Sequence, residues 1–365
     1  MLSESYKGKK VLITGNTGFK GSWLTVWLLN LGADVIGLSR DVPTDPSMFD
    51  VLQLKSKIKH YQGDVTDLSF VKEVVEKESP DFVFHLAAQA IVSTSYSDPC
   101  DTIATNVIGT MNVLEALREY TKPCVAIMIT SDKCYDNVEW LWGYRETDAL
   151  GGKDIYSGSK GAAELVIKSY YHSFFAKAHP VKIAIGRAGN VIGGGDWAKD
   201  RIVVDSVLSW SKGKPVEIRS PKATRPWQHV LEPLSGYLWL GASLENNEAL
   251  NGEAFNFGPK AEQNRTVVEL LADLSADWGF NKVEDAIRIT GNIPFHEAGL
   301  LKLNCDKALF LLRWESNLEY QETIRFISNW YYSYYIDSKD MYELTLSQIK
   351  EYETVAQQRG KIWNP

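Results

Sequence analysis

The sequence predicts an α/β fold, with a doubly wound parallel sheet followed by a smaller C-terminal α/β domain. In the first half, short apolar runs alternate with longer amphipathic stretches. A glycine-rich segment separates the first apolar run from the first amphipathic stretch. From about residue 186, glycine and proline become denser and the order of elements is less regular. A repeating βαβ order gives a parallel sheet with helices on both faces, and 365 residues suggest about two domains.

The pattern predicts the individual elements in order. Strands are expected at 10–14, 34–38, 81–86 and 125–129, with a strand-like run at 181–185, and helices at 22–31, 70–77, 105–120 and 157–175. We assign residues 1–185 and about 227–257 to the first domain, and 186–226 and 258–365 to the second. The aromatic stretch 329–335 is expected to pack a terminal helix on the core or on a partner subunit.

Composition excludes several classes of protein. The net charge of −7 argues against general nucleic-acid binding, which needs a basic surface. No stretch approaches the ~18 apolar residues of a membrane span, and the first residues, MLSESYKGKK, contain no apolar segment. Four scattered cysteines indicate reduced thiols and a cytoplasmic protein. The six histidines show no metal-binding spacing, so we expect no metal.

The glycine-rich segment predicts a dinucleotide site. Residues 14–21 read TGNTGFKG, with glycines at 15, 18 and 21 after the first strand and at the start of the first helix. Gly15 suits the tight turn, Gly18 lets the backbone approach a pyrophosphate, and Gly21 lets the helix pack close to the sheet. The free N–H groups of the helix N-terminus then face the phosphates. The first domain is therefore expected to be a Rossmann-type dinucleotide-binding domain.

The end of the second strand bears on the choice of dinucleotide. An acidic residue there would hold the ribose 2′-OH of NAD, whereas an arginine would suit the 2′-phosphate of NADP. The sequence offers both Arg40 and Asp41, so this point stays open; NAD is expected, with NADP as the alternative because of Arg40. Asp64 and Val65 either border the adenine ring or form an ordinary strand end.

Two further motifs carry groups that move protons. Ser131, Asp132 and Lys133 follow the strand at 125–129, and ligands bind at the carboxyl ends of such strands. Tyr156 and Lys160 are four residues apart, so they share one helix face. We expect the lysine, together with a positive nicotinamide, to lower the pKa of Tyr156 so that it can act as a base.

These motifs together resemble a known family. The glycine loop, Leu86-Ala87-Ala88-Gln89, Asn106, Ser131 and the Tyr156/Lys160 pair are similar to those of the extended short-chain dehydrogenase/reductases that modify nucleotide sugars. Longer stretches resemble the 4,6-dehydratase branch that acts on CDP-glucose: FKGSW at 19–23, TSDKCYDN at 130–137, GRAGNVIGGGDWAKDR at 186–201 and RPWQHVLEPLSGY at 225–237.

The resemblance implies a cofactor site and a catalytic set. The implied cofactor contacts are Gly15, Thr17, Gly18, Phe19, Lys20, Gly21, Arg40, Asp64, Val65, Leu86, Ala87, Ala88, Gln89, Asn106, Tyr156 and Lys160. For catalysis, Tyr156 takes the O4 proton with help from Ser131 and Lys160, Lys133 takes the C5 proton, and Asp132 protonates the departing C6 hydroxyl. A close ion pair between Asp132 and Lys133 would oppose these roles, so we expect them to point at different substrate atoms.

The resemblance also implies a substrate and an assembly. CDP-glucose is the expected substrate, with Asn190 and Arg225 at its phosphates; Arg201 is either a further phosphate contact or a surface charge. Arg187 has either a structural or a functional role, and His229 is expected to be structural. A homodimer is expected through the helices at 105–120 and 157–175. The alternatives are another nucleotide-sugar 4,6-dehydratase, a 4-epimerase, which has no need for Asp132 and Lys133, and a non-catalytic dinucleotide sensor.

Overall fold

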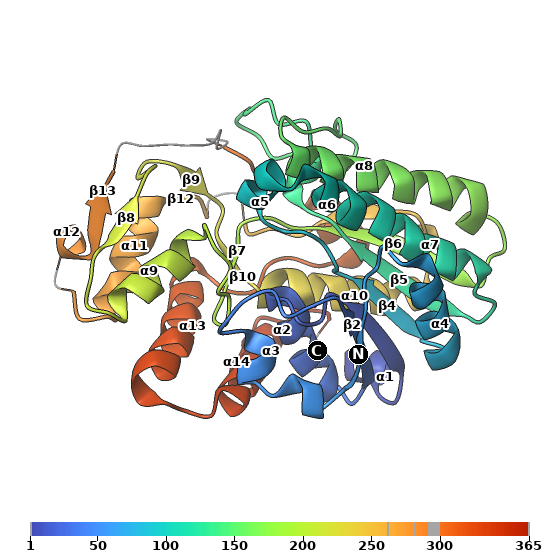
Figure 1. Ribbon diagram of the computed structural model, residues 1–365, viewed down its shortest axis with the longest axis horizontal. Helices are drawn as coiled ribbons and strands as arrows, with labels where there is room; N and C mark the ends of the chain where they lie inside the picture. The colour runs from blue at the N-terminus through green and yellow to red at the C-terminus, as the bar shows by residue number, and fades with distance from the viewer. Residues whose placement is uncertain (1, 261–262, 281, 291–299, 364–365) are drawn as a thin grey trace.

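The computed structural model describes residues 2–260, 263–280, 282–290 and 300–363. Its centre is a seven-stranded sheet in the order β11-β6-β5-β4-β1-β2-β3 (Figure 1). Every neighbouring pair in this sheet is parallel. The strands are β1 (Lys10–Thr14), β2 (Asp34–Ser39), β3 (Lys59–Gln62), β4 (Phe82–His85), β5 (Cys124–Ile129), β6 (Val181–Arg187) and β11 (Ala254–Asn256). This is a Rossmann-type doubly wound sheet, as predicted, with its switch point between β1 and β4.

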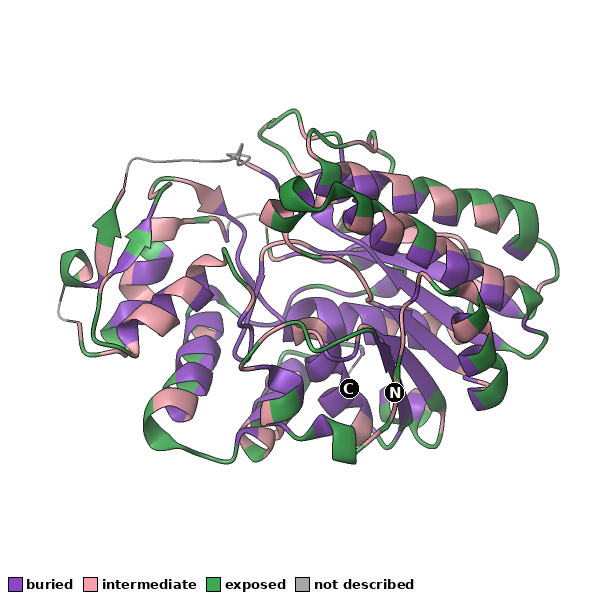
Figure 2. Cartoon of the chain, viewed as in Figure 1, coloured by how far each residue is buried: buried purple, intermediate pink, exposed green. Residues whose placement is uncertain are grey.

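Helices cover both faces of the sheet, as Figure 1 shows. One face packs on α4 (Leu68–Glu78), α7 (Thr110–Glu119) and α8 (Ile155–Tyr170). The other packs on α1 (Leu2–Tyr6), α2 (Phe19–Asn30) and α10 (Leu231–Asn246). The central strands are mostly buried, β3 at the edge is not, and the outer faces of the helices are exposed (Figure 2). A strand that is buried on both faces has a continuous apolar sequence. This is why β5, with the sequence CVAIMI, could be predicted.

Several helix boundaries differ from the prediction. The first long helix begins at Phe19, because Gly18 is its N-cap, so Lys20 and Gly21 lie inside its first turn. The helix predicted at 105–120 is divided into the π-helical segment η2 (Ala104–Gly109) and α7, and it follows the short helices α5 (Val92–Ser97) and α6 (Pro99–Ile103). α8 continues as a second π-helical segment, η4 (Tyr171–Phe175). Three short helices complete this half: α3 (Met48–Val51), η1 (Leu54–Ser56) and η3 (Asp132–Cys134).

A smaller part of the molecule lies beside the carboxyl edge of the sheet, at the left of Figure 1. It contains α9 (Ile202–Trp210), α11 (Val267–Ala276), α12 (Val283–Ala286) and the paired strands β8 (Val216–Ile218) and β13 (Ile287–Ile289). β9 (Thr224–Arg225) pairs with β12 (Arg265–Thr266), and β7 (Val191–Ile192) with β10 (Gln228–His229). The remaining segments are η5 (Glu248–Leu250), η6 (Ala308–Leu312), η7 (Ser333–Asp337), α13 (Tyr320–Tyr332) and α14 (Met341–Gln358).

The chain crosses between the two parts more than once. α10 packs on β5 and β6, and β11 extends the central sheet, so residues 231–256 lie with the first part. α14 packs on α2 of the sheet layer, although its residues fall in the predicted second domain, whose limits stay a prediction. Trp330 and Tyr331 of the aromatic stretch are buried, and they contact Trp197 in a loop beside the sheet edge.

Candidate active site

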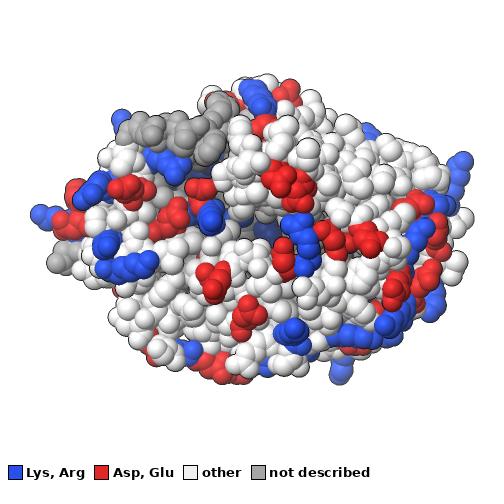
Figure 3. Space-filling model, in the orientation of Figure 1, with Lys and Arg blue, Asp and Glu red and all other residues white. Residues whose placement is uncertain are grey.

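A cavity of about 1120 Å³ lies between the carboxyl edge of the sheet and the smaller part. Acidic and basic side chains alternate along the hollow that crosses the middle of the molecule (Figure 3). The predicted site residues that line the cavity are Gly15, Thr17, Gly18, Phe19, Lys20, Gly21, Arg40, Asp64, Val65, Leu86, Ala87, Ala88, Gln89, Ser131, Asp132, Lys133, Tyr156, Lys160, Asn190, Arg201 and Arg225. Segments far apart in the sequence therefore meet in one cavity.

The glycine loop has the geometry that a dinucleotide pyrophosphate requires. Gly15 has φ +76°, and a Cβ there would lie 2.7 Å from the Ala87 nitrogen. A Cβ at Gly21 would lie 2.2 Å from the Gly15 oxygen, whereas one at Gly18 would come no closer than 3.4 Å to that oxygen. No side chain caps the N-terminus of α2, so its N–H groups are left for an anion. The loop therefore fits the phosphates of NAD.

Arg40 is surrounded by carboxylates at the end of β2. Its guanidinium forms ion pairs with Asp41 at 3.2 Å, Asp64 at 3.4 Å and Asp101 at 2.9 Å. The hydrogen bond and charge of Asp101 raise the pKa of Arg40 above its ordinary value. The same strand end is tied to the glycine loop, because Thr17 donates a hydrogen bond from Oγ1 to the Asp41 carbonyl at 2.7 Å.

Asn106 supports the cavity wall but does not line it. Its side chain is buried; Oδ1 accepts a hydrogen bond from the Gln89 nitrogen at 2.8 Å, and Nδ2 donates to the Gln89 carbonyl at 3.1 Å. Nδ2 also donates to Ser159 Oγ at 2.8 Å. Asn106 therefore fixes Gln89 at the end of the Leu86–Gln89 segment, and its direct contact with the cofactor stays a prediction.

The Ser131-Asp132-Lys133 triplet forms a single short turn, η3, beyond β5. Ser131 accepts a hydrogen bond from the Lys133 nitrogen at 3.2 Å and donates to Asp132 Oδ1 at 3.0 Å. Asp132 is buried against Gly189, where an added Cβ would lie 1.9 Å from Asp132 Oδ2. Lys133 is half-buried, and within the described ranges no ion pair joins it to Asp132. The two groups are therefore separately available to a ligand.

Tyr156 and Lys160 lie on the buried face of α8, whose N-cap Asp154 accepts a hydrogen bond from the Ser157 nitrogen. Burial raises the pKa of Tyr156 to about 12, and the hydrogen bond with Ser131 acts in the opposite direction. Burial also lowers the pKa of Lys160 to about 8. Among the residues of the chain, burial therefore dominates the pKa of Tyr156, and the expected lowering by Lys160 together with a positive nicotinamide stays a prediction.

Arg187, whose role the sequence left open, is structural. Its guanidinium is buried in a doubly bonded ion pair with Glu164. His229 is structural as well: its Nδ1 accepts a hydrogen bond from the Leu231 nitrogen, and the ring packs between Trp23 and Phe326. Burial lowers the pKa of His229 to about 3, so the ring is neutral.

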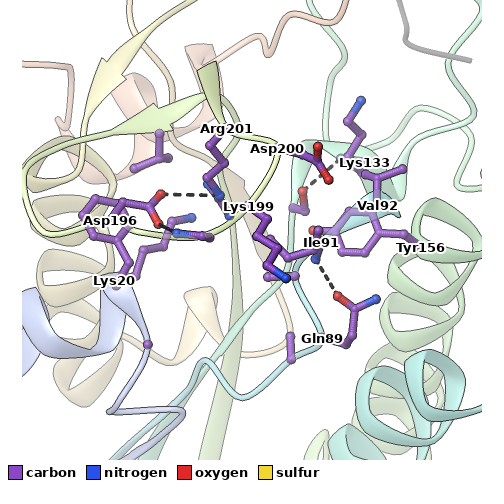
Figure 4. Close-up of a pocket in the computed structure, with 18 of the residues that line it drawn as sticks. Lys20, Gln89, Ile91, Val92, Lys133, Tyr156, Asp196, Lys199, Asp200 and Arg201 are labelled. Carbon is purple, nitrogen blue, oxygen red and sulfur yellow. Dashed lines mark hydrogen bonds and ion pairs between the residues drawn. The ribbon is translucent and has the colours of Figure 1, made fainter. Parts of the chain in front are cut away.

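The predicted phosphate-binding residues lie where the smaller part meets the sheet. Arg201 forms an ion pair with Asp196 at 3.4 Å, and Figure 4 shows this pair on the opposite side of the cavity from Tyr156, with Lys20 beside it. Burial lowers the pKa of Lys20 to about 8, with Arg201 acting in the same direction. Asn190 has φ +53° at a tight turn, and Arg225 lies in β9.

Sequence reasoning missed Asp196, Asp200 and Tyr331 in the cavity wall. Asp196 holds Arg201, and Tyr331 of α13 donates a hydrogen bond to the Asp196 carbonyl at 2.6 Å. Ser93 donates to Asp200 Oδ2 at 2.6 Å, which links α5 to the loop before α9. The GGGDW stretch contains Asp196 and was quoted only as a resemblance, while Tyr331 lies in no motif. Within the described residues, no cluster of side chains could hold a metal, and no helix is long and apolar enough to cross a membrane.

A Rossmann sheet whose strand-end serine shares a cavity with a Tyr/Lys pair defines a short-chain dehydrogenase/reductase. The model of the GDP-mannose 4,6 dehydratase family matches residues 12–327. The chain therefore belongs to this family of nucleotide-sugar 4,6-dehydratases, which are NAD-dependent hydro-lyases of the epimerase/dehydratase group.

Individual relatives agree with this assignment. The chain is 43% identical over 352 residues to the CDP-glucose 4,6-dehydratase of Salmonella typhimurium, a match that covers 95% of this chain and 97% of the relative. It is 29% identical to the CDP-paratose 2-epimerase of Salmonella typhi, over 72% of this chain and 82% of that one. The structure of a dTDP-glucose 4,6-dehydratase from Streptomyces venezuelae with NAD bound superimposes with a TM-score of 0.76 at 20% identity, covering 90% and 100% of the two chains.

Proposed function

We propose that this enzyme converts CDP-D-glucose to CDP-4-dehydro-6-deoxy-D-glucose and water, in the biosynthesis of deoxysugars of the lipopolysaccharide type. The observation that carries the proposal is the triplet Ser131-Asp132-Lys133 in one cavity with Tyr156 and Lys160. The relative with 43% identity over nearly both chains is a CDP-glucose 4,6-dehydratase, which supports the choice of nucleotide and hexose.

The first step oxidises C4 of the glucose. Bound NAD supplies the hydride acceptor at C4 and the hydride donor at C6. Tyr156 takes the proton from O4, and Ser131, which is hydrogen-bonded to Tyr156, orients that oxygen. Lys160 is on the same helix face and is mostly protonated at pH 7, so its charge favours the phenolate as it forms.

The second step removes water across C5 and C6. The new C4 ketone makes the C5 hydrogen acidic, so a base and an acid are both needed. Lys133 takes the C5 proton, Asp132 gives its proton to the departing O6, and a proton is added back at C5 when C6 receives the hydride. The lack of an ion pair between these two described side chains supports the assignment of one as base and the other as acid. A direct ion pair would stabilise the charged form of each.

The charges around Arg40 favour NAD over NADP. Asp41, Asp64 and Asp101 already neutralise this guanidinium, and a 2′-phosphate would bring two more negative charges among three carboxylates. NAD should therefore bind at least about tenfold more tightly than NADP, as titration of the cofactor-free protein would measure. Replacing Asp64 and Asp101 by asparagine should narrow this difference, and equal affinities in the unaltered protein would contradict it.

The pyrophosphate of the substrate is assigned to Asn190, Arg201 and Arg225, all of which line the cavity. Arginine suits this role because its guanidinium can grip phosphate oxygens in pairs. We further propose a homodimer through η2 and α7 on one side and α8 and η4 on the other, where Ile108 of η2, Leu165 of α8 and Phe174 of η4 are exposed. The four free cysteines suit a reducing compartment such as the cytoplasm.

The test uses CDP-glucose labelled with deuterium at C4, catalytic NAD and no reductant. A dehydratase makes a product that has lost one water and carries the label at C6, because the hydride returns within the same site. A 4-epimerase, the second candidate, would leave the mass of the substrate unchanged and form the C4 epimer. A dinucleotide sensor would leave the substrate untouched, and either of these results would contradict the proposal.

A further inference from the structure

The cavity extends past the two arginines into the smaller part of the molecule. This far end is lined by Val204 of α9, Ile218 of β8, Ala223 and Val267. The Val267 nitrogen donates a hydrogen bond to the Ala223 carbonyl at 3.0 Å, which fixes two of these walls together. Figure 1 shows α9, β8 and α11 on one side of the molecule and α8, which carries Tyr156, on the other. The apolar walls suit the faces of a flat ring.

A carboxylate lies at this apolar end. Asp205 is in the first turn of α9, and its backbone nitrogen donates a hydrogen bond to the carbonyl of Arg201, the N-cap residue, at 2.9 Å. It lines the cavity and is half-buried. Among the described residues, its side chain has no hydrogen bond or ion pair, although Arg219 is near enough to act on it electrostatically. Burial raises the pKa of Asp205 to about 6, with the charge of Asp200 acting in the same direction.

A partly desolvated carboxylate without a donor is costly, and a ligand that brings an N–H group removes that cost. The proposed function indicates which part of the substrate binds next to Asp205. With the glucose at Tyr156 and the pyrophosphate at Arg201 and Arg225, we assign the nucleoside to the part of the cavity that α9 lines with Val204 and Asp205. The group that meets this carboxylate is then the edge of the base.

We propose that Asp205 reads the exocyclic amino group of the nucleobase and so selects cytidine over uridine and thymidine nucleotides. Cytosine presents N4–H₂ as a donor, and a carboxylate is a suitable acceptor for it. Uracil and thymine present the O4 acceptor at the same position, which would face the carboxylate with no proton between the two oxygens. The inference rests on the proposed function for the direction of the ligand, and it adds the residue that sets the nucleotide.

The test measures the affinities of CDP and UDP by titration calorimetry at pH 8, where Asp205 is ionised. The unaltered protein should bind CDP at least about tenfold more tightly than UDP. Asp205→Asn should shrink this ratio at least about tenfold, because an amide can donate to O4 of uracil. Glu217→Gln is the matched control: Glu217 lines the same cavity but is exposed, and this variant should keep the original ratio.

A second measurement uses only the unaltered protein, so it holds even if the Asp205 variant fails to fold. The diphosphate of pyrimidin-2-one riboside is CDP without the amino group, and it should bind at least about tenfold more weakly than CDP. Equal binding of these two nucleotides, or an Asp205→Asn variant that weakens CDP and UDP alike or neither, would overturn the inference.

Nucleotide binding does not require turnover, so the two proposals fail separately. A protein that prefers CDP but makes no dehydrated sugar contradicts the proposed reaction and leaves the role of Asp205 intact. A protein that dehydrates CDP-glucose but binds CDP and UDP equally contradicts the role of Asp205 alone.

Discussion

Glu164 and Arg187 form a doubly bonded ion pair directly behind the strand end that carries Ser131. Nε to Oε1 and Nη2 to Oε2 are both 2.8 Å, and the side chains are 1% and 3% exposed. Thr130, the neighbour of Ser131, donates a hydrogen bond to the same Glu164 carboxylate. Arg187 also donates to the Tyr135 hydroxyl at 2.6 Å. This pair therefore fixes both sides of the turn that carries the proposed acid and base.

Removing one partner should be strongly destabilising. Arg187→Met leaves the Glu164 carboxylate buried without its counter-charge, and should reduce the free energy of unfolding by about 3–5 kcal/mol. Arg118→Met, which removes a partly exposed arginine paired with Glu115, should cost much less, because solvent screens this pair. Urea denaturation of both variants measures the difference, and similar losses for the two would contradict the structural role assigned to Arg187.

Lys133→Ala tests the proposed base. Without the amine, C5 should no longer exchange its proton with solvent, and formation of the dehydrated sugar should fall roughly 10²–10⁴-fold. Affinity for NAD should be unchanged, because Lys133 is assigned no cofactor contact. Lys153→Ala removes another lysine that lines the cavity and should keep the normal rate. Normal turnover by the Lys133 variant would show that another group is the base.

Gly189→Ala tests the placement of the proposed acid. The new Cβ would lie 1.9 Å from Asp132 Oδ2, so the carboxylate must move. A displacement of about 1 Å can cost roughly 100-fold in rate, and we expect a loss of that order in product formation. Gly158→Ala is the matched control, since a Cβ there meets nothing within 4 Å. If both variants retain full activity, Asp132 does not need the position it has here.

Glu232 should make stability depend on pH. Burial raises its pKa to about 7, although its carboxylate accepts hydrogen bonds from the Asn317 and Leu318 nitrogens and the Tyr352 hydroxyl. A raised folded-state pKa contributes stability that is fully present below the unfolded value of about 4.3 and is lost as pH rises toward 7.

Glu232→Gln should remove this pH dependence of the free energy of unfolding. Its slope is at most about 1.4 kcal/mol per pH unit between the unfolded and folded pKa values. The comparison is the free energy of unfolding of the unaltered protein minus that of the variant, measured by urea denaturation from pH 4.5 to 7. This difference should fall as pH rises, whereas the same comparison with Glu76→Gln, at an exposed position, should be flat. A flat difference for Glu232 would contradict the prediction.

The sequence predicted the parts of the fold that have a strong local signal. Strands such as β5 are continuous apolar runs, and the glycine loop marks the first turn of the sheet. β3 was missed because KHYQ is polar and lies at the edge of the sheet, where one side needs no apolar neighbour. α10 was missed because LEPLSGYLWLGASLEN is buried on nearly all sides and shows no amphipathic period.

Some residues of the candidate site could likewise be predicted from the sequence, and others could not. The strand-end residues Ser131, Asp132 and Lys133 could be placed together with Tyr156, since parallel strands bring their carboxyl ends to one edge. Asp205 and Tyr331 come from helices far along the chain, and no local motif shows that they reach this edge. Burial, which decides the pKa of Tyr156, is also a property of the assembled fold and not of the Tyr156/Lys160 spacing.

The central claim, elimination by a solvent-exchanging base next to a C4-oxidising site, is tested most directly in D₂O. CDP-glucose is incubated with the enzyme and catalytic NAD, and the product is analysed by mass spectrometry and NMR. The account predicts loss of one water with one deuterium gained at C5. Unchanged mass with a new C4 epimer, or a dehydrated product without deuterium at C5, would contradict it.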